Sequence, residues 1–143
     1  MTLANPTTHT APLVALLQGA GVVVGDAAAP AAPTKFAWQG TPGRSTFIPY
    51  AVVYELDQTF DGTLGCPDSD SDFSWQVTCI GSTREQCGTV RHAVNTALIG
   101  QGLSVTGRGV PRIRAEGGAA IRRDESVKPT LFIATPRYAA WST

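Results

Sequence analysis

The sequence predicts an α+β fold, in which two helices pack on one face of a mixed, mainly antiparallel β-sheet. Apolar residues repeat at helical spacing in two segments, around residues 10–19 and 83–99. Residues 72–80 instead alternate between apolar and polar side chains, which is typical of a strand with one buried face. The expected order is helix, three strands, helix and further strands, which is most economically folded with both helices on one side of a sheet.

The N-terminal region is expected to begin with a flexible arm. Residues 1–9 are polar and rich in Thr, so we assign them to the arm and residues 10–143 to a single domain. Thr10 is a suitable N-cap, and Pro12 in the first turn loses no helical hydrogen bond. Gly19 is expected to close this helix.

The strands before the second helix differ in pattern. Buried strands are expected at 22–24 and 50–54, the second of them central in the sheet because it is apolar throughout. Pro and Gly residues indicate a long irregular connection over 25–48. Residues 57–72 are predicted to form an acidic loop that leads into the strand at 72–80.

The second helix carries the strongest sequence signal. Ser82 and Glu85 have the spacing of a capping box, and Gly100 marks the far end of the helix. Between them one face is apolar, and it is expected to pack on the sheet through Cys87, Val90, Val94, Ala97 and Leu98.

The C-terminal third is again strand-like. Short strands are expected at 103–105 and 110–115, with 119–121 as a possible partner of the latter. A last strand begins at 131–134 and continues irregularly towards the C-terminus. Pro136 inside it predicts either an edge position or a bulge, because Pro cannot donate to a strand ladder.

Composition excludes several classes of protein. Hydrophobic residues make up 43% of the 143 residues and charged residues 15%, so the chain can bury a core and is not disordered as a whole. The formal net charge is zero, which argues against general electrostatic binding of nucleic acid. The sequence shows neither a membrane-length apolar run nor a basic signal region, so a soluble, cytosol-made protein without a disulfide framework is expected.

Charges of the two signs are distributed unevenly along the chain. Seven of the eleven acidic residues precede Thr83, and nine of the eleven basic residues follow it. These segments are either solvated faces or surfaces that meet an opposite charge on another subunit, and the sequence leaves both open. The candidate contacts to another subunit or to a further partner are Arg108, Arg112, Arg114, Arg122 and Arg123. The candidate acidic residues, lining a channel or docking a partner, are Asp57, Asp61, Asp68, Asp70 and Asp72.

No motif predicts catalysis, a cofactor or a metal. The segment Asp68–Asp72 has the first three ligand positions of a calcium loop, but Phe73 and Cys79 stand where Gly and Glu are required. The Gly pair at 19–21 follows a helix instead of a strand, which reverses a dinucleotide fingerprint. The Cys residues lack zinc-knuckle spacing, and no Ser or Cys stands in a nucleophile setting. His92 is expected on the helix surface.

Four stretches resemble, in order, the tail terminator proteins of long-tailed phages. They are residues 11–17, residues 49–54, residues 73–81 with the following helix, and residues 122–132, so the resemblance covers nearly all of the chain from residue 10. It implies a small subunit that forms a hexameric ring, caps the last ring of tail-tube protein, stops polymerisation and offers a surface to head completion proteins. It also implies assembly in the host cytoplasm, a place at the head-proximal end of the virion tail, and passage of DNA without specific binding.

The resemblance leaves alternatives open. The segments 25–48 and 57–72 are longer than the simplest family pattern, so it does not assign their contacts. Another neck or head–tail joining protein would share the small size and the lack of catalytic residues. A nucleic-acid-binding module that uses the arginines between Arg108 and Arg123 is a third possibility, although no aromatic residues are interleaved among them.

Overall fold

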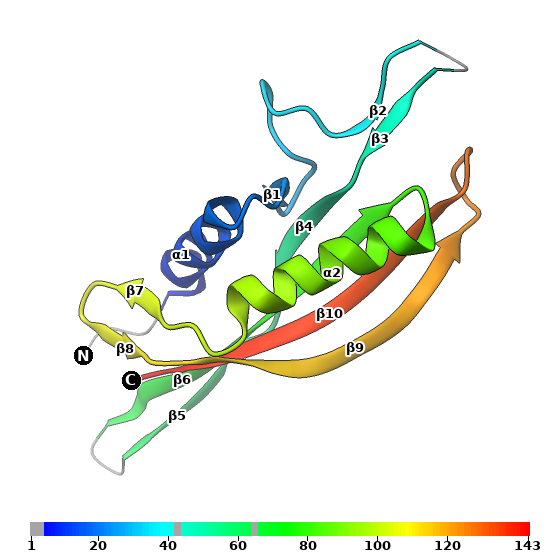
Figure 1. Ribbon diagram of the computed structural model, residues 1–143. Helices are drawn as coiled ribbons and strands as arrows, with labels where there is room; N and C mark the ends of the chain where they lie inside the picture. Colours follow the sequence, from blue (N-terminus) through cyan, green and yellow to red (C-terminus); the bar gives the residue numbers. More distant parts are fainter. Residues whose placement is uncertain (1–4, 42–43, 64–65) are drawn as a thin grey trace.

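The chain folds as one sheet with two helices on one face, which confirms the α+β prediction (Figure 1). This computed structural model describes residues 5–41, 44–63 and 66–143, and the side chains of all of these except 61–63 and 66–69. The helices are α1 (Pro6–Gly19) and α2 (Arg84–Leu98). The strands are β1 (Val24–Asp26), β2 (Ala37–Gln39), β3 (Thr46–Ile48), β4 (Tyr50–Glu55), β5 (Thr59–Thr63), β6 (Cys66–Gly81), β7 (Leu103–Val105), β8 (Arg108–Val110), β9 (Ile113–Asp124) and β10 (Leu131–Ser142).

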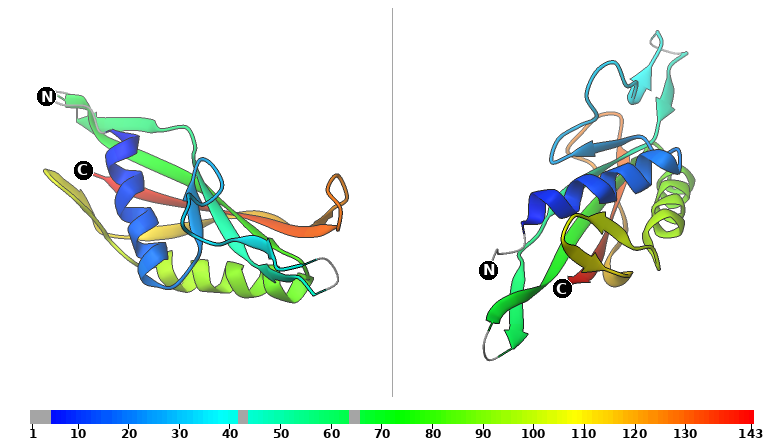
Figure 2. Two further views of the ribbon diagram at one scale, coloured as in Figure 1. Left: turned by 90° about the horizontal axis from the view of Figure 1, so that it is seen from above. Right: turned by 90° about the vertical axis from the view of Figure 1, so that its left-hand side faces the viewer.

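The main sheet is mixed and mostly antiparallel. Its strand order is β1-β4-β6-β10-β9, and β5 pairs with the part of β6 that β4 does not reach. Only β1 and β4 run parallel. Two small hairpins, β2–β3 and β7–β8, lie outside this sheet. The β2–β3 and β5–β6 hairpins project from opposite ends of an elongated molecule (Figures 1 and 2).

The core lies between α2 and the sheet, as the alternation of residues 72–80 predicts. Trp75, Val77 and Cys79 of β6 are buried, whereas the residues between them are partly exposed. They meet the buried face of α2, where Cys87 Sγ donates to the Cys79 carbonyl over 3.4 Å. Burial raises the pKa of the Cys79 thiol to about 12, so both cysteines are inert core residues. Val94 is fully buried on the same helix face.

Helix α1 begins earlier than the sequence predicts. Asn5 is the N-cap and accepts from the Thr7 backbone N–H over 2.9 Å, with Pro6 at the first helical position. Residues 6–9, assigned above to a flexible arm, are therefore helical, and residues 1–4 lie outside the described residues. The Thr-rich composition misleads because the Thr8 hydroxyl bonds back to the Asn5 carbonyl and so satisfies itself within the first turn.

Thr10, the predicted cap, instead anchors the helix to the sheet. Its hydroxyl donates to Glu55 Oε1 over 2.6 Å and accepts from Trp75 Nε1–H over 3.0 Å. The side chain is buried, and it links α1 to β4 and β6. A buried indole N–H needs such a partner, so this contact fixes where α1 lies on the sheet.

The cap of α2 is displaced by one residue from the predicted box. Thr83, not Ser82, is the N-cap, and its hydroxyl accepts from the Gln86 backbone N–H over 3.1 Å. Gln86 Oε1 in turn accepts from the Ser82 backbone N–H over 2.9 Å, so Gln86 takes the place expected for Glu85. Gly100 follows the helix with a φ of +83°, as a helix-ending glycine should.

The predicted acidic loop is instead the β5–β6 hairpin. β6 begins at Cys66 and runs for 16 residues, so the strand expected at 72–80 extends further towards the N-terminus. Alternating Ser and Asp residues resemble a loop in composition, yet they satisfy their backbone by pairing with β5. The connection 25–48 likewise contains β2 and β3, and the first strand lies at 24–26 instead of 22–24.

β9 and β10 form one long curved hairpin. The segments 110–115 and 119–121 do not pair with each other, because most of both lies on β9 and pairs with β10. The register between β9 and β10 shifts twice, once on either side of Pro136. β10 lies inside the sheet, so of the two alternatives predicted for Pro136 the structure shows the bulge. Gly118, with a φ of +151°, allows the close approach that the bulge requires.

Candidate interaction surfaces

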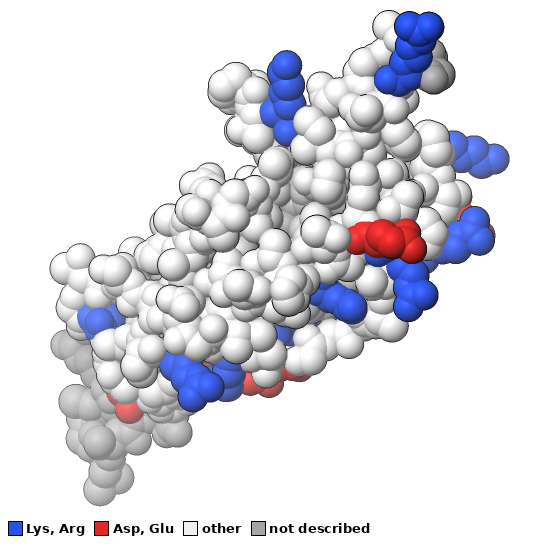
Figure 3. Space-filling model, viewed as in Figure 1, with Lys and Arg blue, Asp and Glu red and all other residues white. Residues whose placement is uncertain are grey.

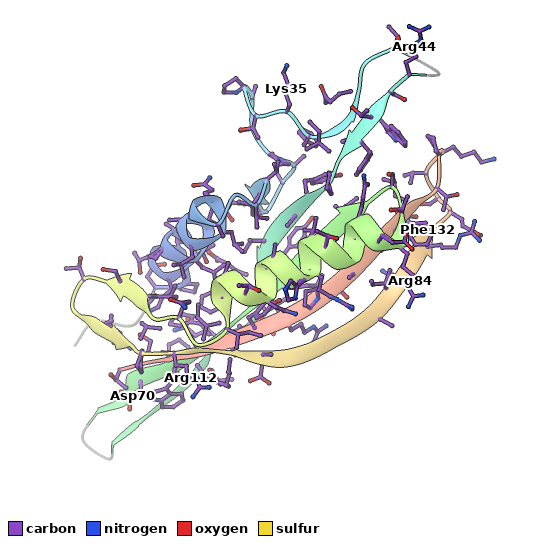
Figure 4. The ribbon with its side chains drawn as sticks, viewed as in Figure 1. Lys35, Arg44, Asp70, Arg84, Arg112 and Phe132 are labelled. Atoms are coloured by element: carbon purple, nitrogen blue, oxygen red, sulfur yellow. The ribbon has the colours of Figure 1, made fainter. Side chains whose placement is uncertain are left out.

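The five candidate arginines form two separate groups. Arg108 and Arg112 lie near the start of β9 together with Arg114, whereas Arg122 and Arg123 lie near its end. Arg122 lies eight positions beyond Arg114 along the strand, which is roughly 26 Å at about 3.3 Å per residue. Arg112 is at the end of the molecule that carries Asp70 (Figure 4). Clustering in the sequence therefore does not produce one basic patch.

Arg114 is occupied within its own subunit. Its guanidinium lies 2.6 Å from Asp72 Oδ2 and 2.8 Å from Glu116 Oε1. The hydrogen bond to Asp72 raises the pKa of Arg114. The side chains are 42% exposed for Arg114 and 29% for Asp72, so solvent screens the pair, which is worth at most about 1 kcal/mol. Two residues that the sequence assigns to different partners thus meet across the sheet.

Arg108 holds the C-terminal end of β10. Its Nε donates to Ser142 Oγ and its terminal nitrogen to the Ser142 carbonyl, both over 3.0 Å. His9 Nε2 lies 2.8 Å from Ser142 Oγ, and His9 Nδ1 lies 2.8 Å from the Asn5 carbonyl. The carbonyl can only accept, so Nδ1 carries the proton and Nε2 accepts from the serine hydroxyl. Burial lowers the pKa of His9, which keeps the imidazole neutral.

The Ser142–His9 pair resembles part of a nucleophile arrangement but is closed to substrates. Both side chains have no exposed surface. A groove of about 920 Å³ runs between the start of α1 and the β7–β8 hairpin, and His9 and Arg108 are among its lining residues, together with Thr8, Pro12 and Val105. Ser142 does not line this groove and has no exposed surface, so the contact acts as a buried clamp on the chain ends.

The candidate aspartates lie on and beside the β5–β6 hairpin. Asp57 is exposed between β4 and β5, and Asp70 is half-buried on β6. The register places Asp61 opposite Asp70, but the side chains of Asp61 and Asp68 lie outside the described part of the chain. Asp72 Oδ1 is buried without a hydrogen-bond partner. Within the described residues, no three His, Cys, Asp or Glu side chains are grouped as metal ligands.

The strongest charge pattern separates the two projecting hairpins. Residues 27–54 contain Lys35 and Arg44 and no acidic residue, whereas residues 55–83 contain six acidic residues and no basic one. The β2–β3 hairpin belongs to the first segment and the β5–β6 hairpin to the second. Figure 3 shows basic side chains and no acidic ones on the projection that carries β2 and β3, and further Lys and Arg side chains along the rest of this face.

Aromatic packing holds the β2–β3 hairpin in place. Trp38 and Phe47 lie opposite each other in the ladder, with ring centroids 5.2 Å apart in an edge-on arrangement. Phe36 packs edge-on against Tyr50 of β4 at 5.0 Å. Trp38 nevertheless remains 40% exposed. The sequence predicts only a connection here, although the lack of acidic residues in this segment is visible in the sequence.

Comparison with known proteins identifies the fold but no family. No family model matches the sequence, and no curated protein matches it. Among solved structures, the chain is similar to one from a structure titled "Virion of native gene transfer agent (GTA) particle". The TM-score is 0.60 at 18% sequence identity, over 92% of this chain and 84% of the other. No helix within the described residues is long and apolar enough to cross a membrane.

Proposed function

We propose that this chain is a structural subunit of a phage or phage-like particle that ends the tail tube. Copies of it form a ring, six-fold in the expected family, that caps the last ring of tail-tube protein and stops polymerisation. The same ring provides the surface to which head completion proteins attach, at the head-proximal end of the tail. The observation that carries the proposal is the fold shared with a virion chain over 92% of the sequence.

The shape and charges of the subunit support assembly into a ring. A ring of identical subunits requires two different, complementary patches on each copy. Two hairpins project from opposite ends of the elongated molecule, and they belong to segments of opposite charge, residues 27–54 and 55–83, which meets this requirement (Figure 1). The acidic residues at one end also repel phosphate, which suits a tube through which DNA passes without specific binding.

A second candidate function is that of another neck protein between head and tail. The shared virion fold favours it equally, because neck components also belong to the particle. The nucleic-acid-binding alternative loses support from the geometry. Its arginines are split between two ends of β9, and three of them form hydrogen bonds or an ion pair within the subunit.

The test is removal of the gene from the phage or element that carries it, followed by electron microscopy of the particles. A tail terminator predicts tubes of excessive and variable length that lack heads. A neck protein predicts tails of normal length that fail to join heads. Normal, infectious particles would contradict both functions, and a plasmid copy of the gene should restore assembly if either is correct.

A further inference from the structure

We propose that the subunits join head to tail, with the basic arm of one copy docked on the acidic hairpin of the next. The basic arm is the β2–β3 hairpin with Lys35 and Arg44. The acidic hairpin is the described part of β5–β6 with Asp57. This inference deepens the proposed ring by naming its interface and the second copy as the partner. It moves the interface away from the arginines between Arg108 and Arg123.

The Lys and Arg of the arm, and Asp57 and Asp70 of the acidic hairpin, form no ion pair with a described residue of their own subunit, whereas Asp72 is paired with Arg114. Figure 4 shows Lys35 and Arg44 pointing away from the body of the molecule, far from Asp70. Charge of one sign without an internal partner favours an opposite surface on another molecule, because complementary charges guide association and register.

Each surface also presents a large exposed aromatic side chain. Trp38 on the arm is 40% exposed, and Phe60 on β5 is 47% exposed. Protein interfaces typically bury such aromatic anchors inside a rim of polar and charged residues. The arm is preorganised for this role, since Trp38 packs on Phe47 and Phe36 packs on Tyr50. Its ordering cost on binding is correspondingly small.

The geometry selects a second copy over other partners. The two hairpins lie at opposite ends of the molecule in every view, so they cannot meet within one chain (Figures 1 and 2). Residues 27–54, which include the arm, contain only basic charges and residues 55–83, which include the acidic hairpin, contain only acidic ones, so these surfaces are complementary between two copies. A polyanion such as DNA would instead be repelled by the acidic hairpin. A contact between two different patches closes into a ring or extends as a filament.

The experiment exchanges the charges of the two surfaces. One variant carries Lys35→Glu and Arg44→Glu, and the other carries Asp57→Lys and Asp70→Lys. Sedimentation velocity at low ionic strength should show wild-type oligomers and an association weakened about 100-fold or more in each variant alone, because like charges then face each other. An equimolar mixture of both variants should recover oligomers, since every contact again joins opposite charges and an even-numbered ring can alternate.

Matched control variants test whether the effect is specific to these two surfaces. Arg137→Glu changes an exposed charge on β10, away from both hairpins, and should leave association unchanged. Trp38→Ala should weaken association without changing its salt dependence. The wild-type oligomer should weaken as salt shortens the screening length from about 30 Å at 0.01 M to about 3 Å at 1 M.

Three results would overturn the head-to-tail contact. They are a monomeric wild-type protein at low ionic strength, no recovery in the mixed variants, or loss of association with Arg137→Glu alone. A DNA mobility shift that Lys35→Glu and Arg44→Glu abolishes, without any effect on oligomers, would assign the arm to nucleic acid instead. These results leave the proposed function to its own test, because the gene deletion reports tube length whichever surfaces join the subunits.

Discussion

The interior under α2 and the two projecting hairpins differ in the burial of their apolar side chains and in the partners of their polar and charged groups. Under the helix, apolar side chains from α2 and β6 are fully buried, and the polar groups of Trp75 and Tyr138 have hydrogen-bond partners. On the hairpins, Trp38 and Phe60 are exposed, and the described charged side chains other than Asp72 form no ion pair within the subunit. The difference indicates that fold stability resides in the interior, and it motivates the proposal that the hairpins contact another molecule.

The contrast between interior and hairpins predicts that a charge placed in the interior causes the largest loss in the free energy of unfolding. Val94→Asp puts a carboxylate on the fully buried face of α2, which packs against β6 and β10. We expect a loss of about 3–5 kcal/mol in the free energy of unfolding, measured by urea denaturation. His92→Asp, at an exposed position of the same helix, is the matched control. Equal stability of both variants would mean that the buried face of α2 is assigned wrongly.

A smaller loss is expected where β9 passes close to β10. A Cβ at Gly118 would lie 2.4 Å from the Thr135 carbonyl oxygen and 2.7 Å from Pro136 Cα, both of which are backbone atoms. Gly118→Ala must therefore separate the strands at the bulge, at a cost of about 1–3 kcal/mol. Gly19→Ala is the control, because a Cβ there meets nothing within 4 Å. If Gly118→Ala melts like the control, the bulge is more adaptable than its geometry indicates.

The sequence predicts the interior under α2 more accurately than it predicts the polar segments outside that interior. The α2–β6 packing is predictable because buried elements repeat their apolar residues with a fixed period. The β5–β6 hairpin and α1's first turn are missed, because Ser, Thr and Asp favour loops unless their polar groups find partners, as Thr10 does with Trp75. The grouping of the arginines is also missed, since a continuous β9 separates residues that a loop would bring together.

The contact of His9 with Ser142, to which Arg108 also donates, predicts that stability depends on pH, with an effect smaller than the losses above. Burial and the nearby Arg108 both lower the pKa of His9 below 6.5. The unfolded chain therefore binds more protons than the folded chain as the pH falls below 6.5, so stability is present above this pH and declines below it. His9→Gln cannot take up the proton and should flatten this decline in a series of thermal melts. An unchanged acid limb in His9→Gln would place the responsible group elsewhere.

The smallest effect on stability is expected for the arm whose charges carry the proposed contact. Lys35 and Arg44 are exposed and lie outside the main sheet, and the aromatic pairs that hold the arm do not involve them. Lys35→Glu with Arg44→Glu should therefore change the free energy of unfolding by no more than about 0.5 kcal/mol per substitution. Urea denaturation at high salt measures this for the monomer, because oligomers would otherwise add their own stabilisation. A loss as large as that of Val94→Asp would show that the arm belongs to the folding core and would remove the distinction between the two regions.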